Sequence, residues 1–144
     1  FNSFSGYTDL VFVVQALGTS QANLLMRVGN GSLDTGANYS ATQMGGNGST
    51  ATSTRNVNDS YYYYTLNSYV QSSTWNTSIH HFMNYSNTAT YKTILTRSNN
   101  SAVGLDAGVG MWRNTAAITT FQIYPNVGQF ATGSTFTLYG IKAA

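Results

Sequence analysis

The side chains best suited to chemistry are few, and their spacing argues against a catalytic or metal site. His80 and His81 are the only histidines of the chain. Because neighbouring residues on a strand point to opposite faces, these two rings are poorly placed to bind one metal ion. The chain has no Cys and no Glu to complete such a site. We therefore expect no metal site, one partly buried imidazole ring and one exposed ring.

The acidic residues are four aspartates on separate segments of the chain: Asp9, Asp34, Asp59 and Asp106. Glycoside hydrolysis needs two carboxyl groups at a defined separation across the bond that breaks. Hydrolysis by an activated serine of the α/β-hydrolase type needs a Gly-x-Ser-x-Gly elbow, which the sequence lacks. The sequence therefore predicts no catalytic residue and no cofactor, and a polysaccharide depolymerase is disfavoured.

An oxygen-rich loop surrounds Asp34 in the stretch DTGAN, which ends at Asn38. Calcium prefers oxygen ligands, but it usually requires several carboxylates, and this loop has only one. An aspartate in such a loop is typical of an Asx turn, in which the side chain accepts a hydrogen bond from the backbone two residues further on. We therefore favour an Asx turn over a calcium site, and we keep Asp34 and Asn38 as candidate surface-ligand or interface residues.

Four consecutive tyrosines, residues 61–64, form the most aromatic segment of the chain. A tyrosine ring is flat and apolar with a polar tip, which suits both sugars and protein interfaces. Alternation along a strand places Tyr61 and Tyr63 on one face and Tyr62 and Tyr64 on the other. We expect one pair in the core and the other against a loop or a subunit. Sugar stacking by Tyr61 and Tyr63 is the alternative.

The composition of the 144 residues favours an all-β fold. Ser, Thr, Asn and Gly make up 65 of them, while charged residues make up 7%, against about 25% in typical domains. Thr, Val, Tyr and Phe suit strands, and Asn, Gly and Ser suit turns. The formal net charge of +2 is small, the basic residues are scattered, and no apolar stretch is long enough to span a membrane. We therefore expect neither nucleic-acid binding nor membrane insertion.

Short apolar or alternating segments, separated by turn-forming residues, predict about eight strands. Residues 8–17 are the most apolar and predict a central strand buried on both faces. Residues 29–54 predict a long loop region with one short strand at 38–44, and the glycines of residues 104–112 predict a bend before a short strand. The other expected strands are residues 22–28, 61–66, 79–85, 91–97, 118–124 and 135–141. This pattern is typical of a two-sheet antiparallel β-sandwich of jelly-roll type.

Four stretches of the chain form a recognisable pattern: NGSLDTGANYS at residues 30–40, NYSNT with YKT within residues 84–93, GMWRNTAAI at residues 110–118 and LYGIKAA at residues 138–144. With them the chain resembles the C-terminal domain of many tailed-phage tail-fibre and virion-decoration proteins, including those of cyanobacterial phages. Residues 57–75 depart from that pattern, so binding through loops is the family property that is least safely carried over to this chain. The resemblance implies a structural role on the virion, and it supplies no catalytic residue and no cofactor.

The resemblance also sets expectations about the whole protein. We expect one non-enzymatic β-sandwich domain over residues 1–144, the C-terminal part of a longer protein on the virion surface. The expected partners are further copies in a homotrimer, other capsid or tail proteins, and a host-surface glycan. Trp112 and Arg113 are candidate interface residues, because Trp and Arg are enriched at hot spots. The alternatives are that Trp112 lies in the core beside a solvent-facing Arg113, and that the chain is a carbohydrate-binding module.

Overall fold

The computed structural model describes residues 1–2 and 4–143, and these residues form eleven β-strands and no helix. The strands are β1 (Asp9–Ala16), β2 (Leu24–Asn30), β3 (Ser32–Leu33), β4 (Tyr39–Gly46), β5 (Ala51–Asp59), β6 (Tyr62–Tyr63), β7 (Asn76–Met83), β8 (Lys92–Asn100), β9 (Gly104–Trp112), β10 (Thr120–Pro125) and β11 (Thr135–Ile141). The predicted all-β class is therefore confirmed.

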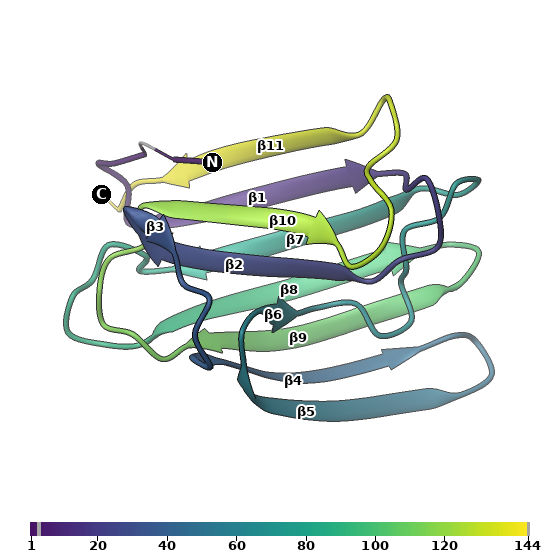
Figure 1. The fold of residues 1–144 in the computed structure, drawn as a ribbon, viewed down its shortest axis with the longest axis horizontal. Coiled ribbons are helices and arrows are strands. Elements are labelled where there is room, and N and C mark those ends of the chain that lie inside the picture. The colour runs from purple at the N-terminus through teal and green to yellow at the C-terminus, as the bar shows by residue number, and fades with distance from the viewer. Residues whose placement is uncertain (3, 144) are drawn as a thin grey trace.

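Two antiparallel sheets lie face to face as a sandwich (Figure 1). The large sheet has seven strands in the order β11-β1-β7-β8-β9-β4-β5. The small sheet contains β10, β2 and β3, with β6 also paired to β2. In Figure 1 the small sheet lies in front of the large one, and the two termini lie close together beside β11. The predicted two-sheet antiparallel sandwich is confirmed.

The core lies between the two sheets and is built from every second side chain of their strands. On β1, Leu10, Phe12 and Val14 are at most 1% exposed. Phe121 of β10 reaches across from the small sheet, and its ring centroid is 5.0 Å from those of both Phe12 and Phe82. Burying such a side chain stabilises the fold by about 1.5–3 kcal/mol. This aromatic cluster holds the two sheets together.

The exposure pattern of β1 corrects the prediction that this strand is buried on both faces. Its inward-facing residues are buried, but Val11 and Val13 are only half-buried and Gln15 is exposed. The small sheet covers one side of the large sheet, and the other side faces solvent (Figure 1). The continuous apolar run of residues 8–17 predicted burial on both faces, but two of its valines, Val11 and Val13, lie on the side that faces solvent.

A hairpin of two long strands occupies most of the segment that we predicted to be a loop. The strand expected within residues 38–44 is part of β4, but β5 was not expected. β5 is an edge strand that alternates between exposed and half-buried residues, with no buried side chain. Its side chains are mostly those of Thr, Ser and Asn, so the apolar alternation that predicts a strand is absent.

β9 is a continuous strand and not the predicted bend. It pairs with β8 and with β4 along its length without a register shift. Two of its glycines, Gly108 and Gly110, face inward, where the ring of Tyr62 lies against them. A Cβ atom on Gly110 would come within 2.7 Å of that ring. These glycines therefore make room for a tyrosine and do not bend the chain.

Candidate functional surface

The side of the large sheet that faces away from the small sheet, called the open face here, is more apolar than its exposure to solvent suggests. On β9 the residues at alternate, outward-facing positions are all apolar: Leu105, Ala107, Val109 and Met111. The inward-facing positions of the same strand hold a buried aspartate and three glycines besides Trp112. A sheet covered on one side normally places its apolar residues inward and its polar residues outward. β9 largely reverses that rule.

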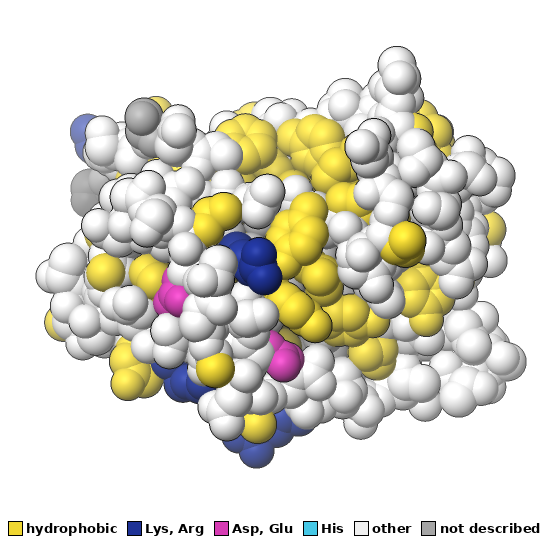
Figure 2. Space-filling model, viewed as in Figure 1, with side chains coloured by type: hydrophobic (Ala, Val, Ile, Leu, Met, Phe, Trp, Pro, Cys, Tyr) yellow, Lys and Arg dark blue, Asp and Glu magenta, His cyan; other side chains and the backbone are white. Residues whose placement is uncertain are grey.

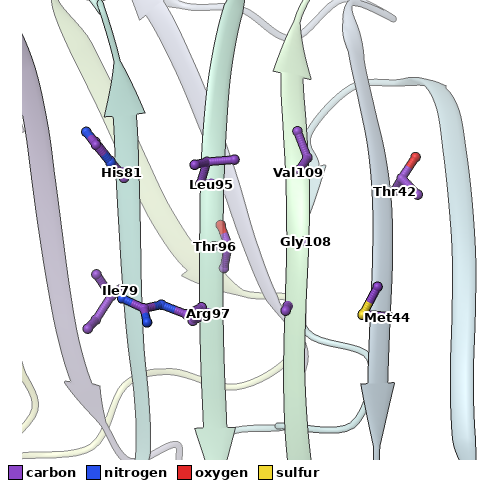
Figure 3. A pocket seen from close by; sticks show the side chains of 10 residues that line it. Thr42, Met44, Ile79, His81, Leu95, Thr96, Arg97, Gly108 and Val109 are labelled. Carbon is purple, nitrogen blue, oxygen red and sulfur yellow. The ribbon is translucent and has the colours of Figure 1, made fainter.

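The apolar surface continues over the strands beside β9. Val109 lies opposite Leu95 of β8, and Ala107 lies opposite Met44 of β4. The exposed fractions are 46% for Val109, 39% for Leu95, 66% for Met44 and 59% for Leu105. Figure 3 shows side chains from β7, β8, β9 and β4 around a depression of about 540 Å³ on this face. A contiguous exposed apolar surface of this kind marks an interaction site.

The open face also carries charged side chains, including Arg55 of β5, which is exposed and lies in one register with Thr42 and Val109. Arg97 extends from β8 across towards Ile79 of β7 (Figure 3). Near the β1 edge, His81 Nε2 and Asp9 Oδ2 are 2.8 Å apart. The other carboxylate oxygen of Asp9 accepts a hydrogen bond from the backbone N–H of Asn84 at 2.6 Å. The open face is therefore an aliphatic patch on β8, β9 and β4 with two arginines, Arg55 and Arg97, and other polar side chains around it.

Polar side chains are instead buried on the inner side of the large sheet. Asp106 is 2% exposed, and its carboxylate accepts hydrogen bonds from the backbone N–H groups of Leu66, Asn67 and Ser68 at 2.7–3.0 Å. The hydroxyl of Ser68 donates a further bond at 2.6 Å. Gly45 lies opposite, where a Cβ atom would be 2.1 Å from the Asp106 carboxylate. These bonds anchor the loop that follows β6 over the end of the sheet.

The two histidines occupy opposite sides of β7, as alternation predicts. His80 is fully buried, and its ring nitrogens lie 3.1 Å from the hydroxyl oxygens of Ser78 and Thr96. Burial lowers the pKa of His80 to about 3, so its ring is neutral at physiological pH. His81 lies on the open face. In the part of the chain that the structure describes, no three His or Asp side chains converge as metal ligands do.

Four of the predicted site residues meet at one corner of the sandwich. The Asp34 carboxylate accepts hydrogen bonds from the indole N–H of Trp112 at 2.7 Å and from the Asn38 amide at 2.9 Å. Arg113 donates to the carbonyl oxygen of Ala37 at 2.6 Å. Trp112 is 1% exposed and belongs to the core. The cluster therefore ties a loop to the end of β9, and its surface part is Arg113.

The Asp34 carboxylate itself is satisfied by the fold. One of its oxygens accepts a hydrogen bond from the backbone N–H of Gly36 at 2.8 Å, which is the Asx turn that we predicted. Burial acts to raise the pKa of Asp34, but hydrogen bonds from Trp112, Asn38 and Gly36 outweigh it, and the pKa lies below its usual value. Three protein donors thus satisfy the carboxylate: the backbone N–H of Gly36, the Asn38 amide and the Trp112 indole.

Tyr61 and Tyr63 lie apart from that corner, on the outer side of the small sheet. The other two tyrosines of the run are 1% exposed in the core, so the predicted division into a core pair and an outer pair is confirmed. Tyr63 lies opposite Leu25 of β2, which lies opposite Tyr124 of β10. The structure therefore adds a third tyrosine to the outer pair.

The open face was not anticipated from the sequence. Its signal was present as the alternation of apolar residues within residues 104–112. Alternation divides the residues of a strand into two sets, but it does not tell which set faces the second sheet. The inward-facing glycines obscure the pattern further, because several glycines in a short segment predict a bend.

Comparison of the chain with protein-family models, with curated proteins and with solved structures gave no match. Within residues 1–2 and 4–143 there is no helix with the length and hydrophobicity needed to cross a bilayer. What can be inferred about function therefore comes from the chemistry of the two sheet surfaces.

Proposed function

We propose that this chain is a non-enzymatic structural module of a phage virion that assembles through its open face. The expected partner on that face is a further copy of the chain, in a homotrimer, while other surfaces contact capsid or tail proteins. The observation that carries the proposal is the exposed aliphatic surface of β8, β9 and β4. The resemblance to tail-fibre and decoration domains supports the virion setting.

The open face has the size of a stable protein interface. Its seven strands, about 4.8 Å apart and about eight residues long, span roughly 850 Å². A standard protein interface buries about 800 Å² of each partner. Removal of apolar surface from water contributes about 25 cal/mol per Å² before the costs of association are subtracted. The face is therefore about the size of one such contact, and in a trimer, where each subunit has two neighbours, it would supply one of the two contact patches of the subunit.

The charged groups of the open face restrict how identical copies can meet. Every charged group of a homo-oligomeric interface occurs in each subunit, so a face rich in one sign would repel itself. The face carries Arg55 and Arg97, which points towards Ile79 in Figure 3, and Asp9 and His81 form a pair at one edge. In the assembly that we propose, the apolar side chains are buried and the two arginines stay at the rim of the contact, because burying them unpaired would cost free energy.

The oligomeric state tests the proposal. Light scattering at micromolar concentration should give three times the 15.5 kDa mass of the chain. Val109→Lys should shift the population towards the monomer and weaken assembly at least about 10-fold, because it places an ammonium group in an apolar contact. Circular dichroism checks that the variant keeps its strands.

Val127→Lys is the matched control. Val127 lies in the loop after β10 and is 53% exposed, close to the 46% of Val109, but it is outside the open face. Its substitution should leave the mass unchanged. A wild-type chain that stays monomeric at every concentration, or two lysine variants that behave alike, would count against assembly through this face.

A further inference from the structure

We infer that the outer side of the small sheet carries a second, independent site that binds an acidic oligosaccharide. Three tyrosines and one arginine form it, and we call it the tyrosine platform: Tyr61, Tyr63, Tyr124 and Arg27. Figure 2 shows hydrophobic side chains gathered in a band across this side of the molecule, with one basic and one acidic side chain beside the band. The platform and the open face lie on opposite sides of the sandwich, so both can be occupied at once.

The pairing of the strands places two rings of the platform in a row. Tyr124 of β10 and Tyr63 of β6 lie on either side of Leu25 of β2, in one register. Residues directly opposite one another project from the same side of a sheet. Two strand spacings, about 10 Å, therefore separate the two tyrosines. An extended ligand lying across the strands contacts both rings.

Two phenols of the platform, those of Tyr63 and Tyr124, stay protonated at physiological pH. Burial raises the pKa of Tyr63 to about 12 and also raises the pKa of Tyr124. Tyr61 follows directly after Ser60, whose carbonyl oxygen accepts the hydrogen bond of Arg27, so the backbone places Tyr61 beside Arg27. The half-buried rings thus present flat apolar surface together with hydroxyl groups that can donate and accept hydrogen bonds.

Arg27 gives the platform a positive charge that the fold holds in place. Its guanidinium carbon is 5.4 Å from the centroid of the Tyr124 ring, and its Nε donates to the carbonyl oxygen of Ser60 at 2.9 Å. Among the described residues no carboxylate forms an ion pair with it. The remaining guanidinium N–H groups are therefore suited to a carboxylate or sulfate of a ligand, which they can bind in a bidentate manner.

This combination of groups fits an acidic sugar chain better than a second protein surface. Aromatic rings stack on the apolar faces of sugar rings, and hydroxyl and amide groups bond to their hydroxyls. Gln122, which is exposed and lies opposite Arg27 in register, adds such an amide. Tyrosine and arginine also occur at protein interfaces, but the larger exposed aliphatic surface, which we assign to contact between copies, lies on the open face. The uronic acids of polysaccharides supply the carboxylate that Arg27 would bind.

Binding of two oligosaccharide probes tests the inference. Calorimetric titration should detect binding of a galacturonic-acid oligosaccharide and weaker binding of a neutral glucose oligosaccharide of the same length. Tyr63→Ala and Tyr124→Ala should each weaken binding of the acidic probe about 3- to 10-fold. Arg27→Gln should weaken the acidic probe at least about 10-fold and leave the neutral probe nearly unchanged.

Tyr91→Ala is the matched control, because Tyr91 is 53% exposed and lies outside the platform. It should bind both probes as the unaltered protein does. Absence of binding by the folded protein, or equal binding by the platform variants and the control, would overturn the inference. Val109→Lys should keep sugar binding while it loses assembly, so failure of this site and failure of the proposed function give different results.

Discussion

At the scale of single residues, the buried histidine makes the stability of this sandwich depend on pH. The native pKa of His80 is about 3, whereas an unfolded histidine has a pKa of about 6.5. As pH falls, the unfolded state takes up a proton before the native state does. The contribution of His80 is therefore complete above about pH 7 and is lost between about pH 6.5 and pH 3. Between pH 7 and pH 5 this group alone should remove about 2 kcal/mol from the free energy of unfolding.

Urea unfolding at the two pH values measures that loss. His80→Gln should remove most of the difference between pH 7 and pH 5, because no buried imidazole is then left to resist protonation. His81→Gln is the control, since His81 lies on the solvent-facing side of the same strand, and it should keep the difference. Equal pH dependence in both variants would show that His80 is not the source.

Residue-scale prediction succeeded where a contact depends on strand alternation and failed where it depends on distant partners. Alternation gave the opposite directions of His80 and His81. The partners of Asp106, by contrast, lie about 40 residues away in the loop after β6. The pairing of Tyr124 with Arg27 likewise arises only when β10 and β2 come together. No local pattern in the sequence encodes either contact.

At the scale of elements, β9 depends on its glycines. Gly110→Ala would place a Cβ atom within 2.7 Å of the Tyr62 ring. The ring has little room to move in a packed core, so we expect a loss of about 1–3 kcal/mol in the free energy of unfolding. Urea denaturation measures it. Gly46→Ala is the control on neighbouring β4, where the nearest atom would be 3.5 Å away, and it should have a much smaller effect. Similar losses for both variants would contradict this role for Tyr62.

Whether a strand could be predicted depends on whether its side chains alternate between the core and solvent. The strand predicted at residues 135–141 coincides with β11, because Phe136 and Leu138 face the core at alternate positions. The sequence did not predict β5, because an edge strand whose two faces are both exposed to solvent needs no apolar residue. β9 was misjudged because glycine can serve close packing as well as a turn. Apolar alternation thus predicts strands that have one face towards the core and one face towards solvent, and it predicts few strands of other kinds.

At the scale of the whole molecule, composition sufficed for the fold class but not for the exposed surfaces. Abundant Thr, Val, Tyr and Asn with few charges predicted a β-sandwich, and that is the fold. The two sheets differ in size, however, since seven strands face a small sheet in which β3 and β6 have two residues each. Which side of the large sheet stays uncovered depends on strand pairings between distant segments. The open face is therefore a property of the assembled fold.

The accessibility of one position on the open face tests the central claim most directly. The chain has no cysteine, so Val109→Cys provides a unique thiol in the middle of this face, and Val127→Cys provides one outside it. The rate of maleimide labelling should fall at least about 10-fold for Val109→Cys as protein concentration rises through the assembly range, and it should stay constant for Val127→Cys. A labelling rate at Val109→Cys that does not change with concentration would contradict burial of the open face between copies.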